Sequence, residues 1–472
     1  MVWSNQTAGD VCAARSAAAS RSNHPGLVLT ACILASSLAF VDGSVVNVGL
    51  PAIGHDLKGD ASDLQWVINA YLLPLSSLLL LGGAVGDRFG RRDILVLGTA
   101  VFALGSALCA WAPDLAWLLA ARTLQGTGAA FLLPNSLSVL GGAYSGAARG
   151  RAVGIWSASS AITAAIGPVL GGWLIDTVGW RAIFLLNLPL AAVAIGLALF
   201  FVRNPARGEA ENRIDALGAA FATASLAALT WSLTSGGGQA GWTLRASAAA
   251  AFGLAFAGLF LWTEKRRGPN AMMPLGLFAS ADFVGLTGLT FLLYGALGAL
   301  LVLVPFVLIR GAEYSGTLAG AALLPFPLVL AAASPAMGAL AGRIGSRLPL
   351  IAGPLIVAAG FFLLLRLDMA ANFWSEVFPA MLAIALGMAC IAAPLTTAVL
   401  ASVDARHTGT ASGLNSAVAR SGGMVATALL GGVFAASGAS LFRAFHVAIV
   451  ACAIASLLAG AFVFALVGRQ RQ

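Results

Sequence analysis

Long apolar segments separated by short polar turns constrain this chain more than any other feature of its sequence. A helix that crosses the hydrocarbon core of a bilayer needs about 20 mostly apolar residues. Cutting the 472-residue chain at its charges and at its Gly and Pro turns leaves fourteen segments of that kind. We therefore predict an all-α integral membrane protein with 14 transmembrane helices, over residues 26–49, 64–84, 94–111, 115–140, 150–174, 182–202, 216–234, 246–263, 282–309, 318–340, 349–366, 376–401, 408–434 and 444–467.

Charged residues are too few to coat a soluble protein of this length. They make up 9% of the chain, whereas 59% of the residues are hydrophobic, and soluble domains carry about 25% charged residues. This excludes a soluble multidomain enzyme. The sequence contains no Walker A loop and no HExxH motif, and its five cysteines and four histidines are scattered. We therefore expect no ATP site, no metal site, no cofactor and no enzymatic activity.

The basic residues indicate how the chain is oriented. A net charge of +8 taken alone is compatible with nucleic-acid binding. If the N-terminus is cytoplasmic, however, eighteen of the 26 Lys and Arg residues fall on the cytoplasmic side and six on the other, as expected for a membrane protein. We expect a multi-pass protein of the cell (inner or plasma) membrane with both termini in the cytoplasm and no nucleic-acid partner.

A ten-residue sequence occurs twice. GAVGDRFGRR at 83–92 recurs as GALAGRIGSR at 338–347, with five identical positions and with Gly342 in place of Asp87. Tight basic turns are common between helices, but each copy follows an even-numbered predicted span. The same location in both copies predicts two related six-helix halves, which is a transporter architecture with its substrate path where the halves meet.

The offset of 255 residues between the copies leaves room for two additional helices between the halves. The plan is therefore six, then two, then six helices. We predict a cytoplasmic N-terminal tail (1–25), an N-terminal six-helix bundle (26–202), a linker with two additional transmembrane helices (203–281), a C-terminal six-helix bundle (282–467) and a cytoplasmic C-terminal tail (468–472).

Three ionisable residues, Asp42, Arg122 and Arg420, fall deep within predicted spans. Each costs about 2.5–3.5 kcal/mol or more at the centre of a membrane helix, so all three are functional candidates. The helical rise places Asp42 and Arg122 at one depth, roughly 10–12 Å below the outer edge. A buried carboxyl prefers to be neutral, and a nearby guanidinium favours its charged form. Helix movement would then let Asp42 load and release a proton.

Two of these residues have alternative interpretations. Arg122 can snorkel outward and pair with nothing. Arg420, near mid-depth, can hold an anionic substrate group, partner a carboxylate, or anchor helix packing through backbone carbonyls. The glycines around Pro168 in the fifth span indicate, taken alone, only a kinked packing helix.

Six motifs resemble those of the major facilitator superfamily, and specifically of its fourteen-helix drug:proton antiporter family. The resemblance covers about residues 26–467. The motifs are DGSVVNVGLP at 42–51, LQWVINAY at 64–71, the first copy of the repeat at 83–92, RTLQGTG at 122–128, GPVLGG at 167–172 and WRAIFLLNLP at 180–189.

This resemblance implies the major facilitator fold, and alternating access of two bundles around a central cavity. It implies proton coupling by Asp42 and Arg122. It also implies a latch that closes the inner side, formed by Gly83, Asp87, Arg88, Gly90, Arg91 and Arg92. The antiporter helix motif comprises Gly167, Pro168, Gly171 and Gly172. Candidate substrate or cavity residues are Asn47, Gln125, Asn415 and Arg420.

The predicted function is a proton-coupled antiporter that exports lipophilic small molecules, such as a drug, an antibiotic or a toxic metabolite. The second half has no deep acid, which favours a neutral, monocationic or, with Arg420, anionic substrate. The alternatives are an uptake symporter or facilitator on the same fold, and a membrane sensor or assembly partner that does not transport. We expect a monomer whose partners are its small-molecule substrate, protons and the lipid bilayer.

Overall fold

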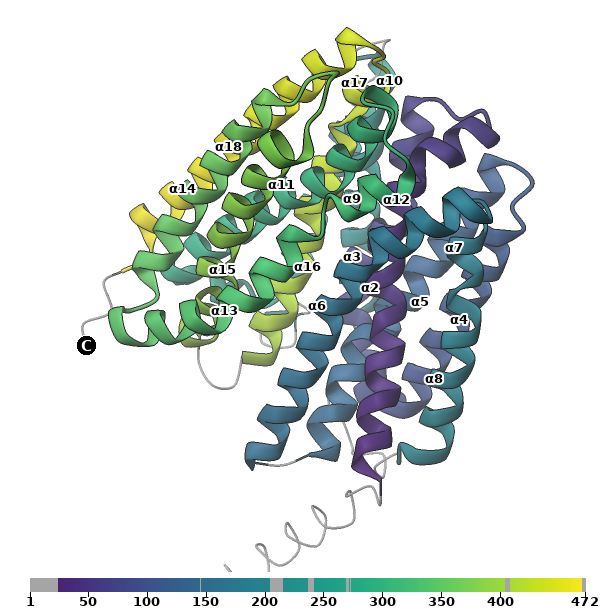
Figure 1. Ribbon diagram of the computed structural model, residues 1–472. Helices are drawn as coiled ribbons and strands as arrows, with labels where there is room; N and C mark the ends of the chain where they lie inside the picture. The colour runs from purple at the N-terminus through teal and green to yellow at the C-terminus, as the bar shows by residue number, and fades with distance from the viewer. Residues whose placement is uncertain are drawn as a thin grey trace, which may run out of the picture.

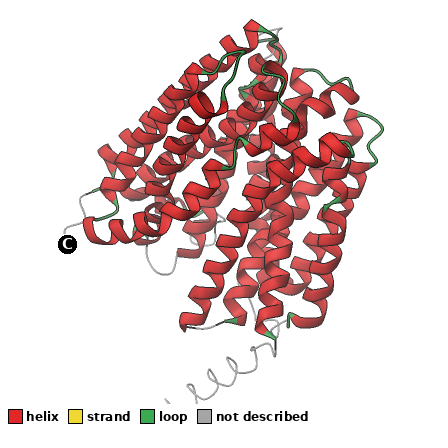
Figure 2. Cartoon of the chain, viewed as in Figure 1, coloured by secondary structure: helices red, strands yellow, loops and turns green. Residues whose placement is uncertain are grey.

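The computed structural model describes residues 24–144, 146–203, 215–236, 242–268, 271, 273–403 and 408–468. Within these ranges every regular element is helical, and Figure 2 shows no strand. The two predicted tails, residues 1–25 and 468–472, lie almost entirely outside the described residues.

The first half of the chain forms six long helical segments. In chain order they are α2 (Pro25–Asp56), α3 (Ala61–Phe89), α4 (Arg91–Ala110), α5 (Leu115–Ala143), α6 (Gly146–Thr177) and the pair α7 (Ala182–Leu185) and α8 (Asn187–Phe201). The region predicted as one span at 182–202 is therefore broken at Leu186. Pro189 lacks the amide hydrogen that would bond the Leu185 carbonyl, which weakens the helix at this point.

Two helices follow before the second half. They are α9 (Ala216–Gly236) and α10 (Leu244–Arg267), after which a short 3₁₀ helix, η2 (Leu275–Ala279), leads onward. Helix α9 packs against α3 and α16, while α10 packs mainly against α9. Arg267 Nη1 lies 3.3 Å from Asp215 Oδ1, so an ion pair joins the end of α10 to the residue before α9.

The second half repeats the plan of the first with more interruptions. Its elements are α11 (Ala281–Gly311), α12 (Gly316–Ala321), α13 (Pro325–Ile344), α14 (Arg347–Leu363), η3 (Leu364–Arg366), η4 (Phe373–Val377), α15 (Phe378–Ala401), α16 (Thr408–Ala428), α17 (Gly431–Phe434) and α18 (Ala439–Leu466). The single spans predicted at 318–340 and 408–434 are both broken. Pro325 and Pro327 interrupt the first, because neither can donate a backbone hydrogen bond.

Twelve helical segments in the described part of the chain are long and apolar enough to cross a membrane. Helices α5 and α16 are not among them, although they contain 29 and 21 residues. Arg122 and Gln125 interrupt the apolar run of α5, and Asn415 and Arg420 interrupt that of α16.

The two halves form two helical bundles that lie side by side (Figure 1), with α2 to α8 in purple to teal and α11 to α18 in green to yellow. Contacts of α2 with α11, α3 with α16 and α6 with α12 join the bundles. The end of the bundles that holds the α2–α3 turn is called the 57–60 end, and the opposite end, which holds the α3–α4 turn, is called the Gly90 end.

Glycines allow α5 to pack closely between α3 and α4. A Cβ atom on Gly126 would overlap the backbone of Tyr71 in α3, and one on Gly128 would overlap the backbone of Phe102 in α4. Small residues of this kind let membrane helices approach closely. As a result, the residue one turn earlier, Arg122, is held in the interior of the first bundle, where it is 1% exposed.

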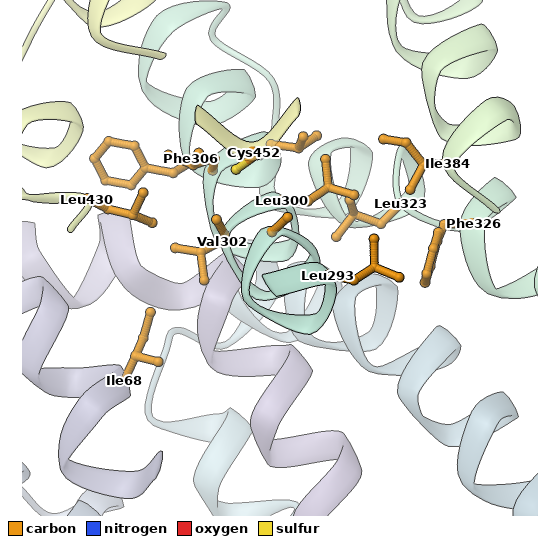
Figure 3. Packing of buried hydrophobic residues seen from close by; sticks show 14 of the residues in the cluster. Ile68, Leu293, Leu300, Val302, Phe306, Leu323, Phe326, Ile384, Leu430 and Cys452 are labelled. Atoms are coloured by element: carbon orange, nitrogen blue, oxygen red, sulfur yellow. The ribbon is translucent and has the colours of Figure 1, made fainter. Parts of the chain in front are cut away.

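Helix α11 runs through the apolar core of the second bundle. Leu293, Leu300, Val302 and Phe306 all project from it into one buried cluster (Figure 3). The cluster continues into the first half, because Ile68 of α3 belongs to it as well. The two bundles thus share apolar packing.

The two copies of the sequence repeat occupy equivalent turns. Gly90 and Gly345, at the same position of each copy, both have positive φ angles, of 110° and 85°, where glycine avoids the strain of other residues. Arg92 Nη2 donates to the Leu199 carbonyl of α8 at 2.7 Å, and Arg347 Nη2 donates to the Phe464 carbonyl of α18 at 2.9 Å. In each half, the repeat arginine therefore bonds the C-terminal end of the last helix.

Candidate transport site

A buried ion pair lies inside the first bundle. Asp42 from the middle of α2 is 2% exposed and accepts a hydrogen bond on Oδ2 from Nη1 of Arg122 in α5. Arg122 Nε also donates to the Val67 carbonyl at 3.1 Å. The structure thus brings together the two residues that the sequence placed at one depth. Arg122 does not snorkel to the surface.

Three polar side chains complete the network around the pair. Gln125 Nε2 donates to Asp42 Oδ1 at 2.7 Å and to Ser106 Oγ at 2.7 Å, while its Oε1 accepts from Arg122 at 2.6 Å. Asn187 Nδ2 donates to Ser106 Oγ at 3.2 Å and, more weakly, to Asp42 Oδ1 at 3.5 Å. The added bonds help to offset the cost of burying two charges.

The network includes one buried acceptor without a donor. Asn187 Oδ1 has no hydrogen-bond partner among the described residues, and Asn187 is fully buried. An unmet buried acceptor is costly, of order 1–3 kcal/mol. Ser106 and Asn187 were not among the predicted site residues. The signal for Asn187 was its place in the motif at 180–189, as a polar residue within an apolar run.

Aromatic rings cover the other faces of the guanidinium. The centre of the Arg122 guanidinium lies 4.4 Å from the centroid of the Tyr71 ring and 5.8 Å from that of Phe184. Tyr71 is itself held in place by a 3.2 Å hydrogen bond from its hydroxyl to the Ala39 carbonyl. Cation–π contacts of this kind stabilise a desolvated cation.

A cavity of about 200 Å³ lies between the two bundles, next to the ion pair. Its wall is formed by α2, α3 and α5 from the first half and by α11 and α16 from the second. Most of the wall is apolar, and it includes Ile68 and Val302, both labelled in Figure 3. The polar or charged residues in the wall are Asn47, Tyr71, Arg122, Tyr294, Arg420 and Thr427. Arg122 therefore faces both the cavity and Asp42.

The four candidate cavity residues separate into two groups. Asn47 and Arg420 line the cavity. Gln125 is fully buried in the ion-pair network instead, and Asn415 accepts a 2.7 Å hydrogen bond from Thr290 and is not part of the cavity wall. Gln125 is three residues from Arg122, so the two share a helix face.

The antiporter helix motif packs against the second bundle. A Cβ atom on Gly172 of α6 would overlap the Gly316 carbonyl, and a Cβ atom on Gly320 of α12 would overlap the Pro168 carbonyl. Gly167 and Gly171 of the same motif face Ser44 and Val45 of α2. The motif thus forms a close-packed contact between α6, α2 and α12.

Polar contacts join the bundles at the 57–60 end. Asp176, near the end of α6, accepts hydrogen bonds from the Gly316 amide at 3.1 Å and from the Thr317 amide and hydroxyl at 2.8 and 2.6 Å. Gln65 of α3 donates to the carbonyls of Thr427 and Ala428, at 3.2 and 3.1 Å, where α16 ends. Both contacts hold the two halves together at this end.

The latch loop contacts other residues of the first half. Asp87 Oδ1 accepts from Arg91 Nε at 2.8 Å, and Arg91 Nη1 donates to the Ser138 carbonyl at 3.3 Å. Arg88 lies over the Phe89 ring at 5.6 Å, and Gly83 and Gly90 lie at the end of α3. The loop therefore ties the α3–α4 turn to α5 in this conformation.

Two helical bundles around a central cavity, with a buried ion pair beside it, define a multi-pass membrane transport protein. Residues 32–309 match the family model described as the Major Facilitator Superfamily. The chain belongs to the Major Facilitator Superfamily and is a multi-pass protein of the cell membrane.

Two relatives illustrate the branch of the family to which the chain is similar. The multidrug resistance protein Stp of Mycobacterium tuberculosis is 34% identical over 422 residues, which span 87% of this chain and 76% of the relative. The tetracenomycin C resistance and export protein of Streptomyces glaucescens is 30% identical over 424 residues, which span 89% of this chain and 77% of the relative.

Solved structures agree on the fold. A POT family transporter in complex with 5-aminolevulinic acid superposes with a TM-score of 0.69 at 13% identity, over 95% of this chain and 97% of that one. A proton-dependent oligopeptide transporter superposes with a TM-score of 0.65 at 16% identity, over 93% and 98% of the two chains. At such low identity the likeness concerns the fold alone.

Proposed function

We propose that this protein exports lipophilic small molecules, such as drugs, antibiotics or toxic metabolites, in exchange for protons by alternating access. The resistance and export functions named for its relatives support export. The observation that carries the proposal is the buried Asp42–Arg122 pair, which borders the cavity between the two bundles through Arg122.

The ion pair suits proton coupling because its charge state depends on the position of one helix relative to another. While Arg122 contacts Asp42, the carboxylate is stabilised in its charged form. Movement of α5 relative to α2 would leave the carboxyl in apolar surroundings, where it binds a proton. When it is protonated, Asp42 carries an O–H donor beside the Asn187 amide. The oxygen of that amide has no hydrogen-bond donor among the described residues.

The proton gradient supplies enough free energy for export and no cofactor is needed. One charge that crosses 100 mV yields about 2.3 kcal/mol. Since about 1.36 kcal/mol corresponds to a tenfold ratio, one proton sustains a substrate gradient of roughly fifty-fold. In this proposal the partners are the proton and the small-molecule substrate, and the protein works as a monomer without nucleic acid.

We place both termini in the cytoplasm, because most basic residues then lie on the cytoplasmic side. In this orientation the 57–60 end faces outward. The contacts of Asp176 and Gln65 at that end then close the outer side, and the conformation is inward-facing. Asp87 and the rest of the latch loop lie at the inner side, where we propose that they engage the second half in the outward-facing state.

We further propose that fourteen helices cross the membrane, in the order six, two, six. The twelve apolar segments are joined by α5 and α16. Arg122 and Gln125 of α5 belong to the ion-pair network, Arg420 of α16 lines the cavity, and Asn415 of α16 bonds Thr290. Residues 26–202 and 282–467 then form the two transport bundles, and 203–281 form the linker, in which α9 packs at the junction of the bundles and α10 packs against α9.

The test is transport by Asp42→Asn in proteoliposomes with an imposed proton gradient. Asn keeps an acceptor for Arg122 but cannot carry a proton. We expect gradient-driven transport to fall by at least about tenfold, as for the loss of a proton-transfer group, while exchange of substrate without a gradient persists. Asp56→Asn is the matched control, since Asp56 lies on the same helix and is paired with Arg181 at its exposed end. Undiminished gradient-driven transport in Asp42→Asn would refute proton coupling by this residue.

The direction of substrate transport is tested in cells. Collapse of the proton gradient should raise the accumulation of a fluorescent substrate in cells that contain the protein, because an exporter then stops working. A fall in accumulation would instead show uptake. A susceptibility screen of cells with and without the protein identifies compounds for this measurement.

A further inference from the structure

Arg420 differs from Arg122 in making no hydrogen bond and no ion pair with a described residue, although it lies near enough to Tyr71 for the two side chains to interact electrostatically. It lies on α16 and forms part of the cavity wall. Within the described ranges it makes no hydrogen bond, no ion pair and no ring contact with another residue, whereas Arg122 contacts Asp42, Gln125 and the Val67 carbonyl. Within the described residues, no hydrogen bond from Arg420 to a backbone carbonyl supports its interpretation as a packing anchor.

The cavity has an excess of positive charge. Its wall contains the guanidinium groups of Arg122 and Arg420 and no carboxyl group from the described residues. The nearby acid, Asp42, lies behind Arg122, and its two oxygens already accept bonds from Arg122 and Gln125. The described part of the wall therefore offers Arg420 no counter-charge. Arg420 is half-buried beside a mostly apolar wall, and a guanidinium without a counter-charge in such surroundings favours a ligand that brings the opposite charge.

The chemistry of the wall defines the matching ligand. A guanidinium presents a planar fork of donors that fits a carboxylate or a similar oxyanion with two parallel hydrogen bonds. The rings of Tyr71 and Tyr294 and the side chains of Ile68 and Leu301 supply flat and apolar surface around it. An organic anion with an aromatic body would meet both features at once.

We propose that Arg420 binds the anionic group of the transported compound, so that the protein selects organic anions with an apolar, aromatic body. This inference rests on the export function proposed above and names its substrate class. Because Arg420 and Asp42 lie on different bundles, the substrate and the proton have separate charged partners. Binding of the anion to Arg420 does not require the Asp42–Arg122 pair to break.

The experiment uses three fluorescent probes with one aromatic body and different charges. They are anthracene carboxylate, anthracene carboxamide and anthracenylmethyl-trimethylammonium. Binding of each is measured by fluorescence to the full-length protein in lipid nanodiscs, for the wild type, Arg420→Lys and Arg420→Gln. We expect the wild type to bind the carboxylate at least about tenfold more tightly than the carboxamide, as is typical of a hydrogen bond to a charged group.

Arg420→Gln should lose this preference and still bind the carboxamide as the wild type does, which also shows that the variant is folded. Arg420→Lys should keep part of the preference, because it retains the charge but not the fork. Tightest binding of the ammonium probe by the wild type, or an unchanged carboxylate preference in Arg420→Gln, would overturn the proposal. So would an equal loss of all three probes in Arg420→Gln, which would indicate a structural role.

Failure of this inference can be told apart from failure of the export function. Gradient-driven transport of the same three probes is measured in proteoliposomes. If none is transported but the carboxylate preference depends on Arg420, the export function fails and the anion site stands. If the neutral or cationic probe is transported and Arg420→Gln changes nothing, export stands and the anion site fails.

Discussion

Arg122 donates a hydrogen bond to Asp42 across 80 residues of sequence, and both side chains are almost completely buried. The contact joins the middle of α2 to α5 inside one bundle. Arg122 and the ring of Tyr71 both belong to the cavity wall, and Asp42 lies behind them. If Asp42 carries the proton, as proposed above, substrate and proton can influence each other through a single guanidinium.

We expect Arg122→Ala to slow or uncouple transport more than Arg122→Lys does. Alanine leaves the Asp42 carboxylate buried without its cation, and breaking a buried pair in this way costs about 3–5 kcal/mol. Lysine restores the charge but cannot bond Asp42, Gln125 and the Val67 carbonyl together. The measurement is the pH dependence of substrate transport in proteoliposomes. A pH profile of Arg122→Ala identical to that of the wild type would mean that the arginine plays no part in proton coupling.

Asp87→Asn should slow the transport cycle while substrate affinity stays within about twofold of the wild type. The Asp87–Arg91 ion pair is exposed. Its loss therefore changes the free energy of unfolding by only about 0–1 kcal/mol. The effect on rate follows from the proposal that the loop at the Gly90 end engages the second half in the outward-facing conformation. Turnover is compared with equilibrium binding of the same substrate. A loss of binding at normal turnover would contradict the latch role.

Replacing either repeat arginine, Arg92 or Arg347, with alanine should lower the stability of the protein by a similar and modest amount. Arg92→Ala and Arg347→Ala each remove a bond to a carbonyl near the C-terminal end of a helix, where a cation is worth about 0.3–1 kcal/mol. We expect both to lower the thermal midpoint in detergent by a similar amount. Arg88→Ala, which removes a neighbouring exposed arginine from the same turn, should change it less. A large drop for one arginine and none for the other would show that the two halves do not use the repeat in the same way.

The sequence was sufficient to locate most of the helical segments and to single out Asp42 and Arg122, because both depend on the cost of polar groups in lipid. Long apolar runs locate the helices, and Asp42 and Arg122 stand out because charge inside them is rare. The rest of the site could not be found in this way. Ser106 resembles the many hydroxyl residues of membrane helices, and only the rotation of α4 and α8 brings it and Asn187 to Asp42. Gln125 could have been placed beside Arg122 from its spacing of three residues.

Pro189, Pro325 and Pro327 are visible signals for two of the three helix interruptions, but the interruption after α16 escaped sequence patterning. Hydrophobicity continues unbroken through the end of α16, yet the helix ends at Ala428. The end of a helix leaves backbone carbonyls without helical partners, and Gln65 from the other bundle takes those of Thr427 and Ala428. This contact joins residues more than 360 positions apart in the chain. Its energy depends on how the bundles dock, which is not encoded in local sequence.

Gly172→Ala should weaken closure of the bundles at the 57–60 end. The added methyl group would overlap the Gly316 carbonyl, and so α6 and α12 must separate at the place where Asp176 bonds Gly316 and Thr317. Gly154→Ala is the matched control, since it is the same change on the same helix and a Cβ atom there meets nothing within 4 Å.

The measurement is the labelling rate of a single cysteine introduced at Asn47 in the cavity wall, with a membrane-impermeant reagent applied from the side of the 57–60 end. We expect Gly172→Ala to raise this rate several-fold and Gly154→Ala to leave it unchanged. Equal rates in the two variants would show that close packing at Gly172 does not hold this end closed.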